Sequence, residues 1–193
     1  MKQSEDKRVI KTKSNLKNTL KEMLKEMPLE KITVKEICER AMTSRITFYN
    51  YYSDKYALLE DIFSDIGSDM DQRFLEKQRR NEADDPMISY QNLLDCFIDL
   101  YNEDIFPISI EKNTALLMPY YRFMVDTTTS LVRKYTPRLK PNYPAEKISI
   151  FIVTGMYGYI HLAKWEKKDK RLYESAHSLL SDLLHSHIFT VNK

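Results

Sequence analysis

Two short helices joined by a tight turn are the feature of this sequence that most restricts its fold. The first begins at the capping box Thr33-Val34-Lys35-Glu36, and we expect it to run to about Ala41. A break follows at Met42-Thr43, and Ser44 is the N-cap of a second short helix over roughly 45–51. Two helices of this length with a tight turn between them form the helix-turn-helix arrangement.

Longer amphipathic helices flank this pair. An apolar stripe with lysines on the opposite, solvated face predicts a helix over about Lys11–Met27, ended by Pro28, and Met1–Ile10 is interpreted as a loose basic arm. After the pair, Ser53 or Asp54 caps a further helix. The side chains that we expect to face mostly inward from this helix are Tyr56, Leu58, Leu59, Ile62, Phe63 and Ile66.

The rest of the chain also has helical patterns. We expect helices over about Ser89–Phe106, Asn113–Tyr135 with a break at Pro119, Ala145–Lys168 and Arg171–Ile188, and loops at 81–86 and 136–144. No strand pattern competes. With 3 glycines and 7 prolines the chain has too few turn formers for an all-β sandwich or a Gly-rich nucleotide-binding fold. The prediction is an all-α protein.

The charge distribution is uneven, although the formal net charge is only +2. Residues 1–60 carry 13 basic and 9 acidic side chains, whereas residues 61–100 carry 4 and 10. A basic end followed by an acidic stretch favours a polyanionic partner for the N-terminal part. Ordinary surface charge explains the same numbers equally well, so charge alone leaves both interpretations open.

The segment between residues 10 and 66 resembles the TetR family of bacterial transcription regulators. The resemblance rests on Ile32–Ala41, on Ser44-Arg45-Ile46-Thr47-Phe48-Tyr49-Asn50-Tyr51-Tyr52, and on Asp54-Lys55 followed by Leu58-Leu59. It implies an all-α homodimer whose N-terminal DNA-binding domain, 1–66, holds the helix-turn-helix at about 33–52. It also implies a C-terminal helical domain, 67–193, for ligand binding and dimerisation. Met42 departs from the family's pattern, since the turn usually holds Gly or Asn and a Met at positive φ would be strained there.

The second short helix carries most of the candidate DNA-binding residues, because a recognition helix presents its N-terminal half to base edges. Arg45 could pair with guanine and Asn50 with adenine or a phosphate, while Ile46 and the methyl group of Thr47 suit a thymine methyl group. Phe48 and Tyr52 are expected to face the core. A plainly solvated Arg45 remains an alternative.

Phosphate contacts would position this helix on the duplex. The resemblance assigns the hydroxyls of Tyr49 and Tyr51 to phosphate oxygens, although a packed Tyr49 stays possible. Lys35 and Lys55 are expected to hold the flanking backbone. The complete candidate set is Lys35, Ser44, Arg45, Ile46, Thr47, Tyr49, Asn50, Tyr51 and Lys55.

The C-terminal part offers weaker candidates. Those for a ligand pocket are Met118, Tyr120, Tyr121, Phe123, Met124 and Tyr157, although aromatic and Met residues at helical spacing more often form core. The two last helices are predicted to form a dimer interface, with Gly155, Gly158, Leu180 and Leu184 as its candidate residues. Filling the core of one subunit is the alternative role for both helices.

Several other classes of site find no support. Cys38 and Cys96 are isolated, and His185-x-His187 does not place two rings on one helix face, so neither a disulfide framework nor a metal site is expected. No catalytic motif, cofactor motif, signal peptide or membrane span is visible, and we expect a cytoplasmic protein.

The sequence therefore predicts a ligand-responsive, sequence-specific DNA-binding transcriptional regulator, expected to be a repressor and not an enzyme. Its expected partners are a near-palindromic double-stranded DNA operator, a second copy of the chain and a small-molecule effector that the sequence does not identify. The alternative is a helix-turn-helix-derived protein-interaction module or co-activator that does not bind DNA itself.

Overall fold

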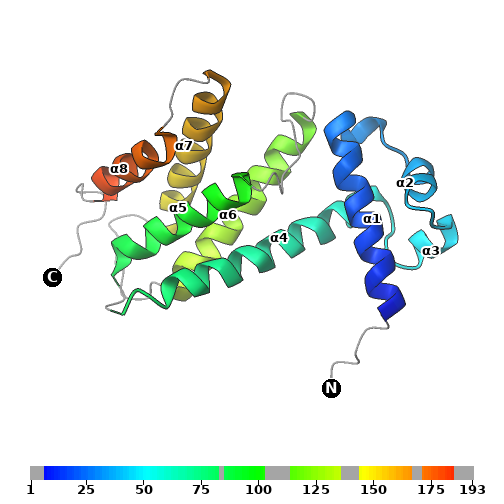
Figure 1. Ribbon diagram of the computed structural model, residues 1–193, viewed down its shortest axis with the longest axis horizontal. Coiled ribbons are helices and arrows are strands. Elements are labelled where there is room, and N and C mark those ends of the chain that lie inside the picture. Colours follow the sequence, from blue (N-terminus) through cyan, green and yellow to red (C-terminus); the bar gives the residue numbers. More distant parts are fainter. Residues whose placement is uncertain (1–6, 83–84, 103–113, 136–143, 167–170, 185–193) are drawn as a thin grey trace. The chain divides into compact units, whose positions relative to one another are not determined.

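A computed structural model of the chain describes residues 7–82, 85–102, 114–135, 144–166 and 171–184. These residues form α-helices and one short 3₁₀ helix, with no strand among them (Figure 1), which confirms the all-α prediction. The chain divides into two compact units, one formed mainly by residues up to Gly67 and the other mainly by those after it. The long helix α4 (Lys55–Gln78) runs from the first unit into the second.

The first unit is built on helix α1 (Lys7–Glu26). Its buried residues are Leu16, Leu20, Met23 and Leu24, which confirms the predicted apolar stripe. The predicted start at Lys11 was wrong, because residues 7–10 are already helical, and the rest of the expected basic arm lies outside the described residues. Pro28 follows the helix, and a 3₁₀ turn, η1 (Leu29–Lys31), leads from it to the helix pair.

Helix α2 (Val34–Arg40) opens with the predicted capping box. The Thr33 hydroxyl accepts a hydrogen bond from the Glu36 backbone N–H at 3.2 Å, and the Glu36 carboxylate accepts one from the Thr33 N–H at 2.9 Å. Bonds from the Thr33 side chain and then from its backbone hold the pKa of Glu36 below its usual value. The carboxylate therefore stays ionised while it caps the helix.

The turn after α2 has the bonding pattern of a Schellman motif. The N–H of Met42 donates to the Glu39 carbonyl at 3.2 Å, and the N–H of Thr43 donates to the Cys38 carbonyl at 2.9 Å. This geometry requires a left-handed residue after the C-cap, and Met42 adopts φ 47°. The strain expected at Met42 from the sequence therefore has a definite origin, because Gly is the usual residue at this place.

Helix α3 (Arg45–Tyr49) begins at Ser44, whose hydroxyl accepts from the Thr47 N–H at 3.0 Å. The helix is shorter than the predicted range, since Asn50 is its C-cap. Asp54, of the two alternatives, caps α4, because its carboxylate accepts from the N–H groups of Tyr56 and Ala57 at 2.8 and 2.9 Å.

The inward face of α4 is almost as predicted. Its buried residues include Leu58, Leu59, Ile62, Phe63 and Ile66 and continue with Met70 and Phe74. Tyr56 was wrongly expected to face inward and is exposed. It lies in the first turn of the helix, at the edge of the buried stripe.

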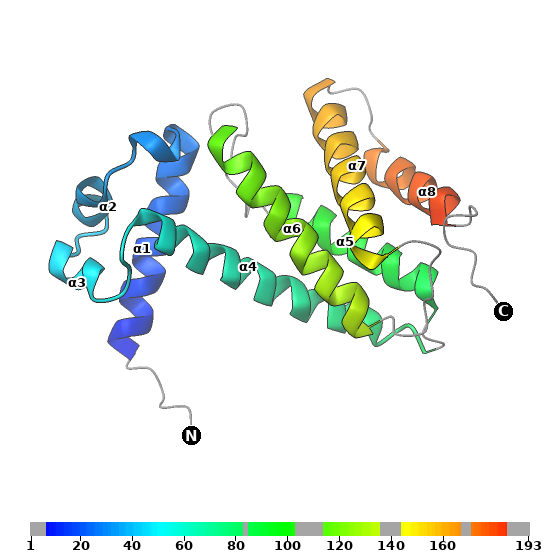
Figure 2. The ribbon, with the colours of Figure 1, turned by 180° about the vertical axis from the view of Figure 1, so that it is seen from behind.

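The second unit contains α5 (Pro86–Asn102), α6 (Thr114–Tyr135), α7 (Ala145–Glu166) and α8 (Leu172–Leu184), and α8 packs against both α5 and α7 (Figures 1 and 2). The predicted break at Pro119 was wrong, since α6 is continuous through it. Pro119 cannot donate to the Ala115 carbonyl, but so near the start of a helix this removes a single bond. The predicted helix ends beyond 102, 166 and 184 and the loop at 136–143 lie outside the described residues.

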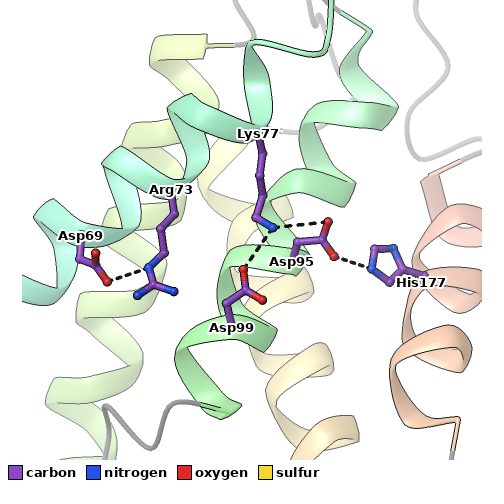
Figure 3. Close-up of polar contacts among 6 residues, drawn as sticks. All are labelled: Asp69, Arg73, Lys77, Asp95, Asp99 and His177. Atoms are coloured by element: carbon purple, nitrogen blue, oxygen red, sulfur yellow. Dashed lines mark hydrogen bonds and ion pairs between the residues drawn. The ribbon is translucent and has the colours of Figure 1, made fainter.

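Polar contacts connect α4, α5 and α8 within this unit (Figure 3). Lys77 on α4 lies 3.1 Å from Asp99 and 4.0 Å from Asp95, and the second oxygen of Asp95 is 2.7 Å from the Nε2 atom of His177 on α8. His177 therefore takes part in helix packing. No group of three metal-binding side chains occurs among the residues described, and no helix within them is long and apolar enough to span a bilayer.

The strained turn predicts a stability gain. Met42→Gly should raise the free energy of unfolding by about 1 kcal/mol, because Gly adopts positive φ without a Cβ clash and the lost side chain is 94% exposed. Met42→Ala removes the same side chain and keeps the clash, so its stability should stay near that of the wild type. Urea denaturation of the three proteins measures the difference, and equal stability of the Gly and Ala variants would contradict the strain.

Candidate nucleic-acid interface

One buried ring orients helix α3. Phe48 is fully buried, its ring centroid lies 5.5 Å from that of Tyr49 in an edge-to-face contact, and it lies 5.7 Å from the ring of Tyr52. The Tyr52 hydroxyl donates to the Asp61 carboxylate on α4 at 2.6 Å. Both residues that we expected in the core are therefore buried, and together they attach α3 to α4.

The opposite side of α3 is open. Ile46 is 77% exposed and Tyr49 is 56% exposed, and Arg45 and Asn50 are exposed as well. This exposure excludes a buried Tyr49, although its ring contacts that of Phe48. The side chain of Ile46 is therefore available for contact with another molecule.

The remaining predicted residues of the helix pair have local roles as well. The hydroxyls of Ser44 and Thr47 lie 2.8 Å apart at the start of α3, and Tyr51 is half-buried. The side chain of Asn15 on α1 donates to the Ala41 carbonyl at 2.6 Å and so holds the turn against α1. Sequence reasoning missed Asn15, because its partner lies 26 residues away in the chain.

Lys35 and Lys55 differ in whether their ammonium groups are available to bind a DNA phosphate. Lys35 is exposed and lies 3.8 Å from Glu39 on its own helix, a weak surface pair. The ammonium group of Lys55 donates to the carbonyls of Leu29, Glu30 and Ile32 at 2.8, 3.3 and 2.7 Å. An ammonium has three N–H donors, and all three are used in hydrogen bonds to these carbonyls. The phosphate contact predicted for Lys55 would therefore have to replace one of these bonds.

The C-terminal candidates differ in how far their side chains are exposed. Met118 is exposed, Met124 is buried in the core, and Tyr120, Tyr121 and Phe123 are half-buried, while the side chain of Tyr157 lies outside the described part of the structure. None of the five candidates with described side chains belongs to the described lining of one open depression on α6. Its described lining consists of Val125, Asp126, Thr129, Ser130, Arg133 and Lys134.

The dimer candidates also differ from expectation. Leu180 is fully buried within one chain, so it is not available to a partner, and the side chain of Leu184 lies outside the described residues. A Cβ atom added at Gly155 or Gly158 would meet no atom within 4 Å, so neither glycine serves a close approach inside the described chain. The exposed apolar residues on these helices are Ile150 and Phe151 on α7 and Leu179 on α8.

A capped pair of short helices, with one helix held by a buried ring and open on its other side, defines a helix-turn-helix protein of the DNA-binding class. Residues 19–62 match the family model described as "Bacterial regulatory proteins, tetR family". The helix-turn-helix segment of this chain thus matches the tetR family model, as the resemblance had indicated.

Two individual proteins are also similar to this chain. One is the "Uncharacterized HTH-type transcriptional regulator YxbF" of Bacillus subtilis (strain 168), 45% identical over 38 residues, which are 20% of this chain and only 10% of that protein. The other is a solved structure described as "Crystal structure of gamma-butyrolactone receptor (ArpA-like protein)". It matches with a TM-score of 0.54 at 12% identity, covers 93% of this chain and 98% of that chain, and so shows a shared fold. These matches are to regulatory and receptor proteins and not to enzymes.

The bonds of Lys55 lead to a test of its role. Lys55→Met should lower the free energy of unfolding by about 1–3 kcal/mol, because it leaves the partly buried carbonyls of Leu29 and Ile32 without their donor. Lys35→Met removes the same kind of charge from an exposed site and should change stability by less than about 0.5 kcal/mol. Denaturant unfolding of both variants measures the difference, and similar small effects would leave Lys55 free for a phosphate.

Proposed function

We propose that this protein is a transcriptional regulator that binds a specific DNA sequence through α3 and acts as a repressor. The observation that carries the proposal is the outward face of α3, where Arg45, Ile46, Tyr49 and Asn50 are exposed while Phe48 is buried. The tetR-type domain and the excess of basic side chains in residues 1–60 support it.

Two kinds of contact follow from this face. Arg45, at the start of the helix, reads guanine through its O6 and N7 atoms, Ile46 and the Thr47 methyl group meet thymine, and Asn50 reads adenine or meets a phosphate. The hydroxyls of Tyr49 and Tyr51 and the ammonium of Lys35 bind backbone phosphates, as does the α3 N-terminus at Ser44, and they position the helix without reading sequence.

The protein binds its operator as a homodimer in this proposal. One helix-turn-helix makes few contacts, whereas a dimer places two recognition helices about 34–36 Å apart on a near-palindromic site. The exposed apolar side chains Ile150, Phe151 and Leu179 are the surface that we assign to the partner, and the open space at Gly155 and Gly158 leaves room for it. A small molecule that binds one dimer state better than the other would change operator affinity by no more than that preference.

Substitutions on α3 test base reading and positioning separately. Arg45→Ala should cost about 1–3 kcal/mol of binding free energy and relax sequence preference at one position of each half-site. Tyr49→Phe should weaken binding evenly across sequences, because a phosphate carries no base information. Affinities on a matched set of operators, selected from a random DNA pool with the wild type, decide between these outcomes.

The pool selection also tests the function itself. Recovery of one enriched, near-palindromic sequence supports a regulator that binds DNA. A wild-type protein that retains no sequence even at low salt would favour a protein-interaction module derived from the same fold. Wild-type affinity and preference in Arg45→Ala would remove the base-reading role of Arg45.

The dimer surface has its own test. The double variant Phe151→Glu/Leu179→Glu should sediment as a folded monomer near 23.0 kDa and bind the operator far more weakly, because it charges an exposed apolar surface. Met118→Glu places a charge on another exposed apolar site, at α6, and should leave the dimer intact. A double variant that remains dimeric would locate the interface elsewhere.

A further inference from the structure

The two halves of helix α1 differ in their balance of basic and acidic side chains. From Lys7 to Leu16 the helix carries four basic and no acidic side chains. In the second half, Lys17 pairs with Asp61 and Asp65, Lys25 with Glu22, and Glu26 with Arg40. The first half therefore holds an excess of positive charge that its own sequence does not balance.

The first two turns of α1 also contain no fully buried side chain. No residue of the helix before Leu16 is buried, and Lys7, Arg8, Ile10 and Lys11 are exposed. Lys7, Arg8 and Lys11 share the helix face opposite the buried stripe. Cations in the first turn of a helix oppose its macrodipole, so helix stability does not account for Lys7 and Arg8.

Two residues that follow the segment Lys7–Lys11 on the same helix contact the helix-turn-helix. Asn15 is bonded to the carbonyl of Ala41 at the turn, and the ammonium of Lys13 lies 5.9 Å from the ring centroid of Tyr52, which follows α3. In Figures 1 and 2 the start of α1 lies at the same end of this unit as α3. The basic segment is thus continuous with the surface assigned to DNA.

We propose that Lys7, Arg8 and Lys11 form a second DNA-backbone contact beside α3 and bind the phosphates that flank the bases read by α3. The inference rests on the proposed function. The partner that binds this basic segment is duplex DNA. A duplex bound at α3 continues beyond that helix and carries one negative charge for about every 1.7 Å of its axis. Lys7 and Lys11 are separated by one helical turn, about 6 Å, so both reach the same stretch of backbone.

The triple variant Lys7→Gln/Arg8→Gln/Lys11→Gln tests this contact in the full-length protein. Each lost phosphate contact reduces the slope of log K against log salt concentration by about 0.9, so the slope should become shallower by about 2–3 for each protomer. Affinity at low salt should fall by a similar factor on all operator variants, because the lost contacts read no sequence. Gln keeps helix propensity, and circular dichroism checks that α1 remains helical.

A matched variant separates a local contact from net charge. Arg79→Gln/Arg80→Gln/Arg171→Gln removes the same charge from exposed positions of the other unit and should keep the wild-type slope. Equal slopes in the two triple variants would overturn the proposal, as would a wild-type slope in the Lys7/Arg8/Lys11 variant. If the wild type binds DNA and only Arg45→Ala weakens it, the second contact fails and the proposed function stands. If the wild type selects no DNA, the function itself fails.

Discussion

The burial of Phe48 is the interaction on which the functional surface depends. A helix as short as α3 has too few internal hydrogen bonds to form by itself, so its position comes from what it buries and from its cap. The Phe48 ring packs against Tyr52, and Tyr52 in turn donates to Asp61 on α4. Once Phe48 faces inward, helical geometry sends Ile46, Tyr49 and Asn50 outward, and the exposed surface of α3 follows from a single apolar contact.

The turn and the first residue of α4 hold this arrangement in place. The Schellman bonds after α2 require a left-handed residue, and the chain places Met42 there although Gly would relieve the strain. Lys55 binds three carbonyls of the segment that precedes α2 and so connects the start of α4 to the entry of the helix pair. A cation that would suit a phosphate is used instead for folding, while Lys7, Arg8 and Lys11 on the first turns of α1 are exposed, as are Lys35 and Arg45.

Much of the fold and of the candidate site could be predicted, because the signals are local. The capping box at Thr33, the cap at Ser44 and the positive φ at Met42 all depend on residues within a few positions of one another. The predictions were wrong where the same local sequence pattern is compatible with two different structures. Pro119 near a helix start leaves the helix intact, and Tyr56 lies beside an apolar stripe without belonging to it. The first turns of α1 show no apolar stripe to predict, because they bury nothing and continue a helix that is packed further along.

The sequence by itself determined the helices, their caps, the strained turn and the identity of the residues on α3, since these depend on hydrogen bonds and periodicity between neighbours in the chain. Only the tertiary structure decided which side chains remain for a partner. Leu180 and Leu179 are adjacent in one apolar stripe, yet one is covered by its own chain and the other is not. Lys35 and Lys55 are both cations near α3, yet the carbonyls that bind Lys55 lie 23 to 26 residues earlier. Burial and long-range hydrogen bonds depend on segments far apart in sequence, and no local pattern records which of them meet.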